Sequence, residues 1–355
     1  MALEFRKVAK RVGAEALIYE TSFTFQPGGF NILLGATNAG KTTLIKLMAG
    51  LDKPTSGEIW LNGRDVTRVP TQQRNVSLVH QFFVNYPTLT VFDNIASPLR
   101  VGGVAAAEIE RRVLEAADLL RLRPYLKRKP AELSGGQQQR TALARAIVKT
   151  SDIVLLDEPL ANLDYKLREE LREQLPRLFA GRGAVVVYAT SEPAEALMLG
   201  GHTATMSAGR VTGFGPTAAL YRAPGDLETA RVFSDPPINA APVIKSGGEV
   251  RLGQDARWAT SGDLAHAPDG EYLVGVRPHF VSPIAGGPRS VAVEGRVVIT
   301  ELSGSESIAH FDLDGRPWVS QSHGVHPFRV GESTRFFIDT RGCLYFRPDG
   351  TQVAA

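Results

Sequence analysis

A phosphate-binding loop is the first chemistry that this sequence indicates. Residues 35–43 read Gly-Ala-Thr-Asn-Ala-Gly-Lys-Thr-Thr and match the pattern G-x-x-x-x-G-K-S/T. Glycines let the backbone approach a phosphate closely, and N–H groups at a helix N-terminus supply positive potential. A glycine-rich turn that binds nothing is the alternative, but the full pattern argues against it. The predicted nucleotide-binding residues are Gly35, Asn38, Ala39, Gly40, Lys41, Thr42 and Thr43.

Within this loop, Lys41 is expected to reach the β- and γ-phosphates, and the Thr42 hydroxyl to ligate Mg²⁺. Two carboxylates, Asp157 and Glu158, follow the apolar run at residues 153–156. At a strand end, Asp157 can hold Mg²⁺ through water, and Glu158 can polarise an attacking water. An apolar run that ends in Asp-Glu is often only a strand end, but beside a phosphate loop it predicts a nucleotide hydrolysis site.

A second phosphate-binding end is predicted at residues 133–140, which read Leu-Ser-Gly-Gly-Gln-Gln-Gln-Arg and precede a helical segment. Ser134 and the glycines Gly135 and Gly136 offer donors at a helix N-terminus. An N-capped helix after a flexible turn is the alternative, but capping alone does not require the whole octet.

The elements around these motifs alternate between strand and helix. Short apolar runs at 32–34, 153–156 and 184–188 predict buried strands, and residues 42–49, 105–122 and 137–149 have helical spacing. Strands that alternate with helices predict a parallel sheet covered on both faces.

The character of the chain changes near residues 234–242, which we interpret as a linker. Beyond it, short β-type runs between Gly, Pro and Asp turns predict a small all-β barrel of the OB type. The expected organisation is an α/β domain over residues 1–235, with a helical subdomain at about 84–150, followed by a β-barrel domain over residues 236–355.

Length and composition exclude several classes of protein. The 355 residues suggest about two domains, and 43% apolar with 22% charged residues excludes global disorder. The net charge of 40 − 37 = +3 gives no support to a nucleic-acid partner. The single cysteine, Cys343, excludes an internal disulfide and fits a reducing compartment. We expect no signal peptide, because residues 1–10 alternate between apolar and charged residues, and no membrane-spanning helix, because no run approaches about 18 apolar residues.

Taken together, these motifs resemble the ATP-binding subunits of ABC transporters in order and spacing. Gln81, within Val-His-Gln-Phe-Phe at 79–83, resembles the family's Q-loop glutamine, which touches Mg²⁺ and signals to the membrane subunits. Ala-Asn-Leu-Asp at 161–164 resembles the D-loop. The resemblance implies a P-loop ABC ATPase fold with a mixed, mainly parallel sheet. It also implies ATP and Mg²⁺ as ligands, with Thr42, Gln81 and Asp157 on the metal and Glu158 as the base.

The resemblance extends into the second half of the chain. Gly-Val-Arg-Pro at 275–278 and Leu-Ser-Gly-Ser-Glu at 302–306 look like the regulatory domain of carbohydrate and polyol importer ATPases. Asn-Tyr-Pro at 85–87 and Asn-Ile-Ala-Ser-Pro at 94–98 are similar to glycerol-importer ATPases.

The family's architecture implies the partners of this chain. Two such subunits close head to tail around two ATP molecules, so Ser134, Gly135, Gly136, Gln137 and Asp164 would serve the partner's site. The implied partners are two integral membrane permease subunits, a second ATPase subunit and, indirectly, an extracytoplasmic solute-binding protein. The implied location is the cytoplasmic face of the plasma membrane. No nucleic-acid partner is implied.

Two positions depart from the family pattern. Ser191 stands where the family places a histidine that contacts the γ-phosphate, and serine cannot supply that positive charge. Val12 stands where members often place an aromatic that stacks on adenine, although Phe5 or Tyr19 could compensate. Tolerated drift is one explanation of these two departures. The alternative that we predict is a heterodimer with a non-identical ATPase subunit, because this chain's own site is weakened.

Two rival functions remain open from the sequence. One is a nucleotide-binding regulatory subunit with little catalysis of its own, suggested by Ser191. The other is a soluble ATPase of the same superfamily in DNA repair or translation, which the single cassette and the appended β domain disfavour. The transported solute is not encoded here, because selectivity resides in membrane and extracytoplasmic subunits.

Overall fold

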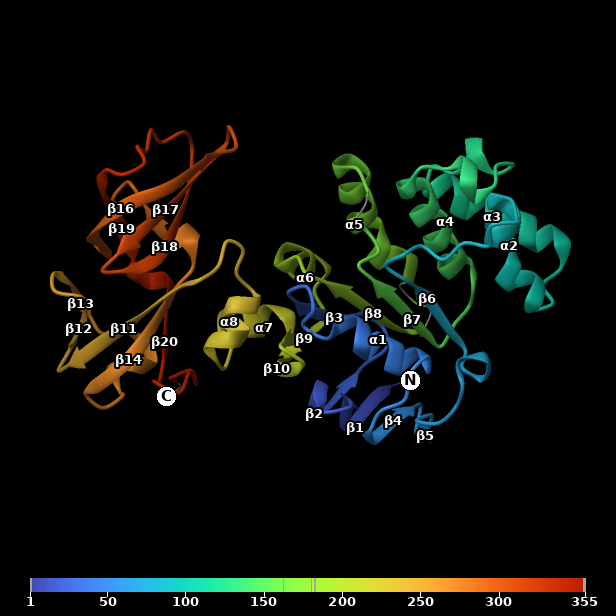
Figure 1. Ribbon diagram of the computed structural model, residues 1–355, viewed down its shortest axis with the longest axis horizontal. Coiled ribbons are helices and arrows are strands. Elements are labelled where there is room, and N and C mark those ends of the chain that lie inside the picture. Colours follow the sequence, from blue (N-terminus) through green and yellow to red (C-terminus); the bar gives the residue numbers. More distant parts are fainter. Residues whose placement is uncertain (1, 162, 180, 182, 354–355) are drawn as a thin grey trace. The chain divides into compact units, whose positions relative to one another are not determined.

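The computed structural model describes residues 2–161, 163–179, 181 and 183–353 (Figure 1). The chain divides into two compact units, Met1–Ala218 and Ala219–Ala355. The first unit is α/β and the second is built mainly from antiparallel strands, so the predicted fold class is confirmed.

A six-stranded sheet forms the centre of the first unit. Its order is β10-β9-β3-β8-β7-β6, and all neighbours are parallel except β9 and β10. The strands are β3 (Phe30–Gly35), β6 (Val76–Val79), β7 (Ile153–Asp157), β8 (Val185–Thr190), β9 (His202–Ser207) and β10 (Arg210–Pro216). Strands β3, β7 and β8 are buried along their whole length, which is why they appear in the sequence as continuous apolar runs.

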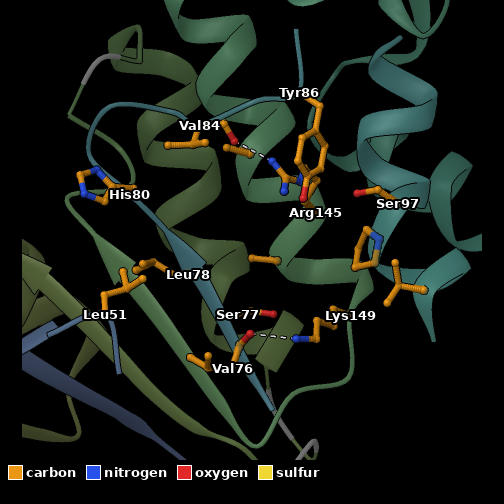
Figure 2. A pocket seen from close by; sticks show the side chains of 14 residues that line it. Leu51, Val76, Ser77, Leu78, His80, Val84, Tyr86, Ser97, Arg145 and Lys149 are labelled. Atoms are coloured by element: carbon orange, nitrogen blue, oxygen red, sulfur yellow. Dashed lines mark hydrogen bonds between the residues drawn. The ribbon is translucent and has the colours of Figure 1, made fainter. Parts of the chain in front are cut away.

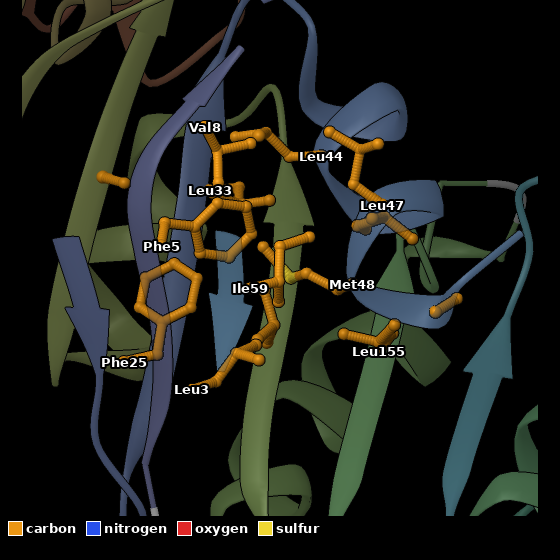
Figure 3. Close-up of a cluster of buried hydrophobic side chains, with 14 of the residues drawn as sticks. Leu3, Phe5, Val8, Phe25, Leu33, Leu44, Leu47, Met48, Ile59 and Leu155 are labelled. Atoms are coloured by element: carbon orange, nitrogen blue, oxygen red, sulfur yellow. The ribbon is translucent and has the colours of Figure 1, made fainter. Parts of the chain in front are cut away.

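A second, antiparallel sheet has the order β2-β1-β4-β5. It contains β1 (Leu3–Val12), β2 (Glu15–Phe25), β4 (Ser56–Leu61) and β5 (Arg64–Asp65). Helix α1 (Lys41–Ala49) packs between the two sheets, and Figure 3 shows Phe5 of β1, Leu44 of α1 and Leu33 of β3 in one buried cluster. This core fixes the start of α1 relative to the strand ends of the central sheet.

The remaining helices of this unit include a group of three, drawn teal to green in Figure 1: α2 (Val91–Val101), α3 (Ala106–Leu119) and α4 (Gly135–Val148). They fall within the helical subdomain expected at about 84–150. Helices α5 (Tyr165–Phe179) and α6 (Pro193–Leu199) follow β7 and β8, and the division between the units falls within α7 (Thr217–Arg222). Among the helices of the described residues, none combines the length and the apolar character needed to cross a bilayer.

Two five-stranded antiparallel sheets make up the second unit, which also contains helix α8 (Leu227–Val232). The first sheet has the order β13-β12-β11-β14-β20, from Asn239–Ser246 (β11), Glu249–Leu252 (β12), Ala256–Ala259 (β13), Gly270–Val276 (β14) and Cys343–Phe346 (β20). The second has the order β15-β19-β16-β17-β18, from Val281–Ser282 (β15), Ser290–Leu302 (β16), Glu306–Leu313 (β17), Arg316–His323 (β18) and Ser333–Asp339 (β19). Both contribute to one hydrophobic cluster that includes Val274, Phe311 and Trp318.

The division after Ala218 lies ahead of the position that the sequence suggested, after residue 235. Leu227 and Ala230 of α8 pack against Ile238 and Phe346 of the β-rich unit. The segment from 219 to 235 therefore contributes Leu227 and Ala230 to a hydrophobic cluster of the second unit.

Candidate nucleotide site

The loop between β3 and α1 requires glycine at two positions, Gly35 and Gly40. A Cβ on Gly35 would lie 2.4 Å from the Met206 carbonyl oxygen, and one on Gly40 would lie 2.8 Å from Ile18 Cδ1. Gly40 is the N-cap of α1 with φ 108°, a left-handed conformation that favours glycine, and no side chain caps the helix. The first N–H groups of α1 are therefore left for an external acceptor, the arrangement that suits a phosphate.

Lys41 is the first residue of α1 and is only 5% exposed. Its Nζ donates to the carbonyl oxygens of Gly35 at 2.7 Å and Ala36 at 3.0 Å, and lies 3.3 Å from Glu158 Oε1. The ammonium is thus held over the loop and next to the carboxylate that the sequence identifies as the base.

Asp157 lies beneath the loop and accepts a hydrogen bond from Thr42 Oγ1 at 3.0 Å on Oδ2. Its other oxygen, Oδ1, is buried and has no hydrogen-bond partner among the described residues. Burial raises the pKa of Asp157, because it disfavours the charged form. An unsatisfied carboxylate oxygen beside a threonine hydroxyl is a donor set that fits Mg²⁺, a hard cation with oxygen ligands.

A hollow of about 360 Å³ opens above these groups. Its lining includes seven of the predicted residues: Asn38, Gly40, Lys41, Thr42, Thr43, Gln81 and Glu158. Thr37, Glu15 and Leu17 complete it. Gly35, Ala39 and Asp157 do not line the hollow: Gly35 and Ala39 are buried in the loop, and Asp157 lies below it.

None of the three residues considered for base stacking, Val12, Phe5 and Tyr19, lines the hollow. Val12 lies at the end of β1, 59% exposed, and β2 instead contributes Glu15 and Leu17 to the hollow. Phe5 cannot compensate, because it is 2% exposed and belongs to the hydrophobic core. Arg210 Cζ lies 3.7 Å from the centre of the Tyr19 ring, and Tyr19 does not line the hollow either. Sequence reasoning did not predict Glu15 or Leu17, and the register shifts in the β1–β2 hairpin are not visible in the residue pattern.

Ser191 follows the end of β8 and is exposed. Strands β7 and β8 are parallel neighbours whose register pairs Asp157 with Ala189, and the Glu158 N–H donates to the Ala189 carbonyl at 3.0 Å. The carboxyl ends of parallel strands meet at one edge of a sheet. The turn that contains Ser191 therefore starts at the same edge of the sheet at which Asp157 and Glu158 lie. Ser191 does not line the hollow itself.

The second predicted phosphate-binding end is separate from this hollow. Ser134 is the N-cap of α4 and forms a capping box with Gln137: the Gln137 N–H donates to Ser134 Oγ at 3.4 Å, and the Ser134 N–H donates to Gln137 Oε1 at 3.0 Å. Ser134 and Gly135 are exposed, Gly136 is half-buried, and a Cβ on Gly135 would meet nothing within 4 Å. Asp164 is also exposed and accepts from the Leu167 N–H at 3.0 Å, while Asn162 lies outside the described residues. None of these five predicted residues lines the hollow.

A groove of about 490 Å³ lies between strand β6 and the helices α2 and α4 (Figure 2). Exposed apolar side chains line it, among them Val84 at 64% and Val101 at 90% exposure. Arg145 donates to the Val84 carbonyl at 2.6 Å and stacks 4.4 Å from the centre of the Tyr86 ring, and Lys149 donates to the Val76 carbonyl at 2.8 Å. Within the described part of the chain, neither cation pairs with a carboxylate, and burial lowers the pKa of both.

Comparisons with known proteins agree with this geometry. Residues 18–161 match the family model described as "ABC transporter". Among solved structures, the ATP-binding cassette MJ0796, a dimer bound to ADP and Pi, has a TM-score of 0.55 and 28% identity, over 61% of this chain and 98% of that one.

Relatives that match nearly the whole chain narrow the family further. The sn-glycerol-3-phosphate import ATP-binding protein UgpC of Ruegeria pomeroyi is 37% identical over 98% of this chain and 97% of that protein. The trehalose/maltose import ATP-binding protein MalK of Thermococcus litoralis is 35% identical over 94% of each. The chain therefore belongs to the ABC transporter family, among the ATP-hydrolysing subunits of its importers.

Proposed function

We propose that this chain is the energy-coupling ATPase of an importer for a small sugar, polyol or glycerol-type solute, and that its catalytic power is shared unequally with a second, non-identical ATPase subunit. The observation that carries the ATPase assignment is the convergence of Lys41, Thr42, Asp157 and Glu158 around one hollow. The solute class is supported by relatives named for import of sn-glycerol 3-phosphate and of trehalose or maltose.

Lys41 and Glu158 form the central pair of the proposed mechanism. Lys41 Nζ lies 3.3 Å from Glu158 Oε1. A γ-phosphate would compete for the ammonium, because charge-assisted hydrogen bonds to phosphate are strong. Glu158, released from this pair, would then accept a proton from the attacking water. Thr42, Asp157 and Gln81 would hold Mg²⁺, which neutralises charge on the phosphates when bound.

Ser134 to Gln137 and Asp164 are proposed to act on the partner's ATP rather than on this chain's own. Their exposure and their distance from the local hollow support that role. The open space around Gly135 leaves room for a phosphate to approach the start of α4. ATP bound between two such chains would draw them together, and hydrolysis would release them.

The groove beside β6 is proposed to receive a helix from a membrane permease subunit. Its exposed apolar lining supplies burial for the helix, and Arg145 and Lys149 leave two cations without a carboxylate partner. These features together favour an amphipathic helix that carries an acidic side chain. β6 leads directly to Gln81, so the groove is linked to the nucleotide hollow through a short segment. Such docking would place the chain peripherally at the cytoplasmic face of the membrane, in an assembly that an extracytoplasmic solute-binding protein serves indirectly.

Unequal sharing of catalysis rests on Ser191. A histidine can stabilise developing charge on the γ-phosphate, and a serine hydroxyl carries no such charge. A nucleotide-binding regulatory subunit with little turnover of its own is the second candidate, and the same residue favours it.

The β-rich unit is proposed to be a regulatory domain.

The test uses the complex purified with its permease subunits, reconstituted in liposomes and supplied with its solute-binding protein. Uptake of labelled sn-glycerol 3-phosphate is measured first, and then uptake of a disaccharide and of glycerol. Val101→Glu, at 90% exposure in the groove, should release the chain from the permease, whereas Val330→Glu, a 64% exposed valine of the β-rich unit, should not. ATP-dependent uptake of none of these solutes by an intact complex would refute the solute class, and normal assembly of Val101→Glu would refute the docking site.

A further inference from the structure

Arg168, on the first turn of α5, connects two turns that are far apart in the sequence. Its Nη2 donates to the carbonyl oxygens of Ala161 at 3.1 Å and Leu163 at 3.5 Å, both in the turn 161–164. Its Nη1 lies 3.1 Å from Glu192 Oε1, next to Ser191. One guanidinium therefore holds both turns, and the rigid fork of arginine favours such double contacts.

The turn that contains Ser191 is itself firmly anchored on both sides. Thr190 Oγ1 donates to Glu195 Oε2 at 2.6 Å and accepts from the Glu192 N–H at 3.0 Å. Arg172, 7% exposed, reaches Glu192 Oε2 at 2.6 Å and Glu195 Oε1 at 2.9 Å. Ser191 thus lies between two fixed residues, so a displacement of its turn must move the Glu192 carboxylate.

We infer that Arg168 is a positioning residue that links the turn bearing Ser191, at this chain's own ATP site, to the turn 161–164, which serves the opposite site. This inference rests on the proposed function, which assigns Ser191 to one site and Asp164 to the other. In this coupling, a displacement of the turn that bears Ser191 shifts Glu192, Arg168 follows, and the carbonyls of Ala161 and Leu163 move with it. Arg168 itself touches no substrate.

The proposal favours arginine at this position over other residues that could stabilise α5. Lysine could still meet the Glu192 carboxylate, but its single ammonium does not reproduce the fork that spans carboxylate and carbonyls. Arg168 Nε is buried without a hydrogen-bond partner, so the outer nitrogens alone make the connection. A misplacement of about 1 Å in catalytic groups can lower a rate on the order of 10²-fold.

The experiment measures ATP hydrolysis against ATP concentration in the assembled complex. Arg168→Gln is compared with Arg168→Lys and with Lys166→Gln, which removes an exposed charge from the same helix. We expect Arg168→Gln to lower kcat by roughly 10- to 100-fold and to bring the Hill coefficient to about one, with ATP binding to the isolated chain unchanged within about twofold. Arg168→Lys should be intermediate, and Lys166→Gln should match the unmodified complex.

A merely structural role would lower the melting temperature and leave the Hill coefficient alone. The inference is overturned if Arg168→Gln keeps both kcat and cooperativity, or if the unmodified complex shows no cooperativity to transmit. If Arg168→Gln fails to fold, the comparison of Arg168→Lys with Lys166→Gln decides in the same way. Failure of the proposed function looks different, because the unmodified complex would then hydrolyse no ATP.

Discussion

The phosphate-loop hollow and the start of α4 are both suited to phosphate, but they differ in how complete they are. At the hollow, Lys41 pairs with Glu158 and Thr42 bonds to Asp157; Lys41 and Asp157 are buried, and Thr42 and Glu158 are half-buried. At the start of α4, the side chains of Ser134 and Gln137 form a capping box, and Ser134 is exposed. The first half-site is assembled by this chain's own fold. The second lies apart from the hollow, and we propose that it acts on a neighbouring subunit.

Replacement of the catalytic glutamate in one subunit at a time should reveal the largest difference between the two composite sites. We expect Glu158→Gln in this chain to slow transport only moderately, because its own site is weakened at Ser191. The equivalent change in the partner subunit should abolish transport, because that site pairs a complete hollow with this chain's Ser134 end. Uptake into liposomes measures both. Equal losses, or an active complex with this chain as the sole ATPase, would contradict the heterodimer.

Restoration of the missing histidine should rescue the weaker site. In a complex whose partner glutamate is already replaced by glutamine, Ser191→His is expected to raise ATP turnover by about 10²- to 10³-fold, the effect typical of one transition-state donor. Ser191→Ala in the same background is the matched control and should change little. If Ser191→His leaves turnover at background, the substitution at this position does not explain the weakness.

Lys41→Ala tests the buried hollow in the isolated chain. The change removes two or more charge-assisted hydrogen bonds to phosphate, together worth about 3 kcal/mol, so ATP affinity should fall about 10²-fold. Fluorescent-nucleotide binding measures the loss. Lys46→Ala, on the same helix, is the control. Unchanged binding by the Lys41 variant would refute the phosphate-loop assignment.

Ser134→Ala tests the other half of the comparison. ATP binding to the isolated chain should stay the same, whereas ATP hydrolysis by the complex should fall about tenfold, because a donor to the partner's phosphate is lost. The cap itself contributes about 0.5–2 kcal/mol to helix stability. Asp226→Ala removes a comparable N-cap, from α8, and should leave hydrolysis unaffected. A drop in isolated-chain affinity for Ser134→Ala would show that the two half-sites are not separate.

Removal of the β-rich unit should have the smallest effect on nucleotide binding. A chain of residues 1–222, which ends with α7, is expected to bind ATP within about twofold of the full chain. A chain of residues 1–235 should bind equally but be less soluble, since it exposes Leu227 and Ala230, which pack on Ile238 and Phe346 in the whole protein. Size-exclusion chromatography with nucleotide binding compares them. Aggregated, non-binding 1–222 would show that the first unit depends on the second.

The parts that sequence predicted well are those whose chemistry is local. The phosphate loop occupies nine consecutive residues, and its glycines, lysine and threonine have fixed roles along a strand–loop–helix. The cap of α4 is likewise encoded within four residues. The position of the division between the two units was harder to predict from sequence. Leu227 and Ala230 of α8 pack against Ile238 and Phe346, and Phe346 lies more than a hundred residues further along the chain.

The β1–β2 hairpin shows a second limit of sequence. Base stacking at Val12 stays a prediction, and the structure adds Glu15 and Leu17 of β2 to the lining of the hollow. The pairing of β1 with β2 contains register shifts, and a shift of one residue turns a strand's side chains to the opposite face, so the residue pattern alone does not predict which of them line the hollow. The Arg168–Glu192 pair is similar, because opposite charges 24 positions apart carry no signal of contact.

By itself, the sequence determined which residues can bind phosphate and hold a metal, since backbone freedom, charge and hydroxyl chemistry belong to residue types and short spacings. Only the tertiary structure decided which of them meet. Thr42 and Asp157 are 115 positions apart, and they bond because β3, β8 and β7 align their carboxyl ends at one sheet edge. The same alignment sets Ser191 beside that edge and leaves the start of α4 outside it, because strand order and register are properties of the packed core rather than of any segment.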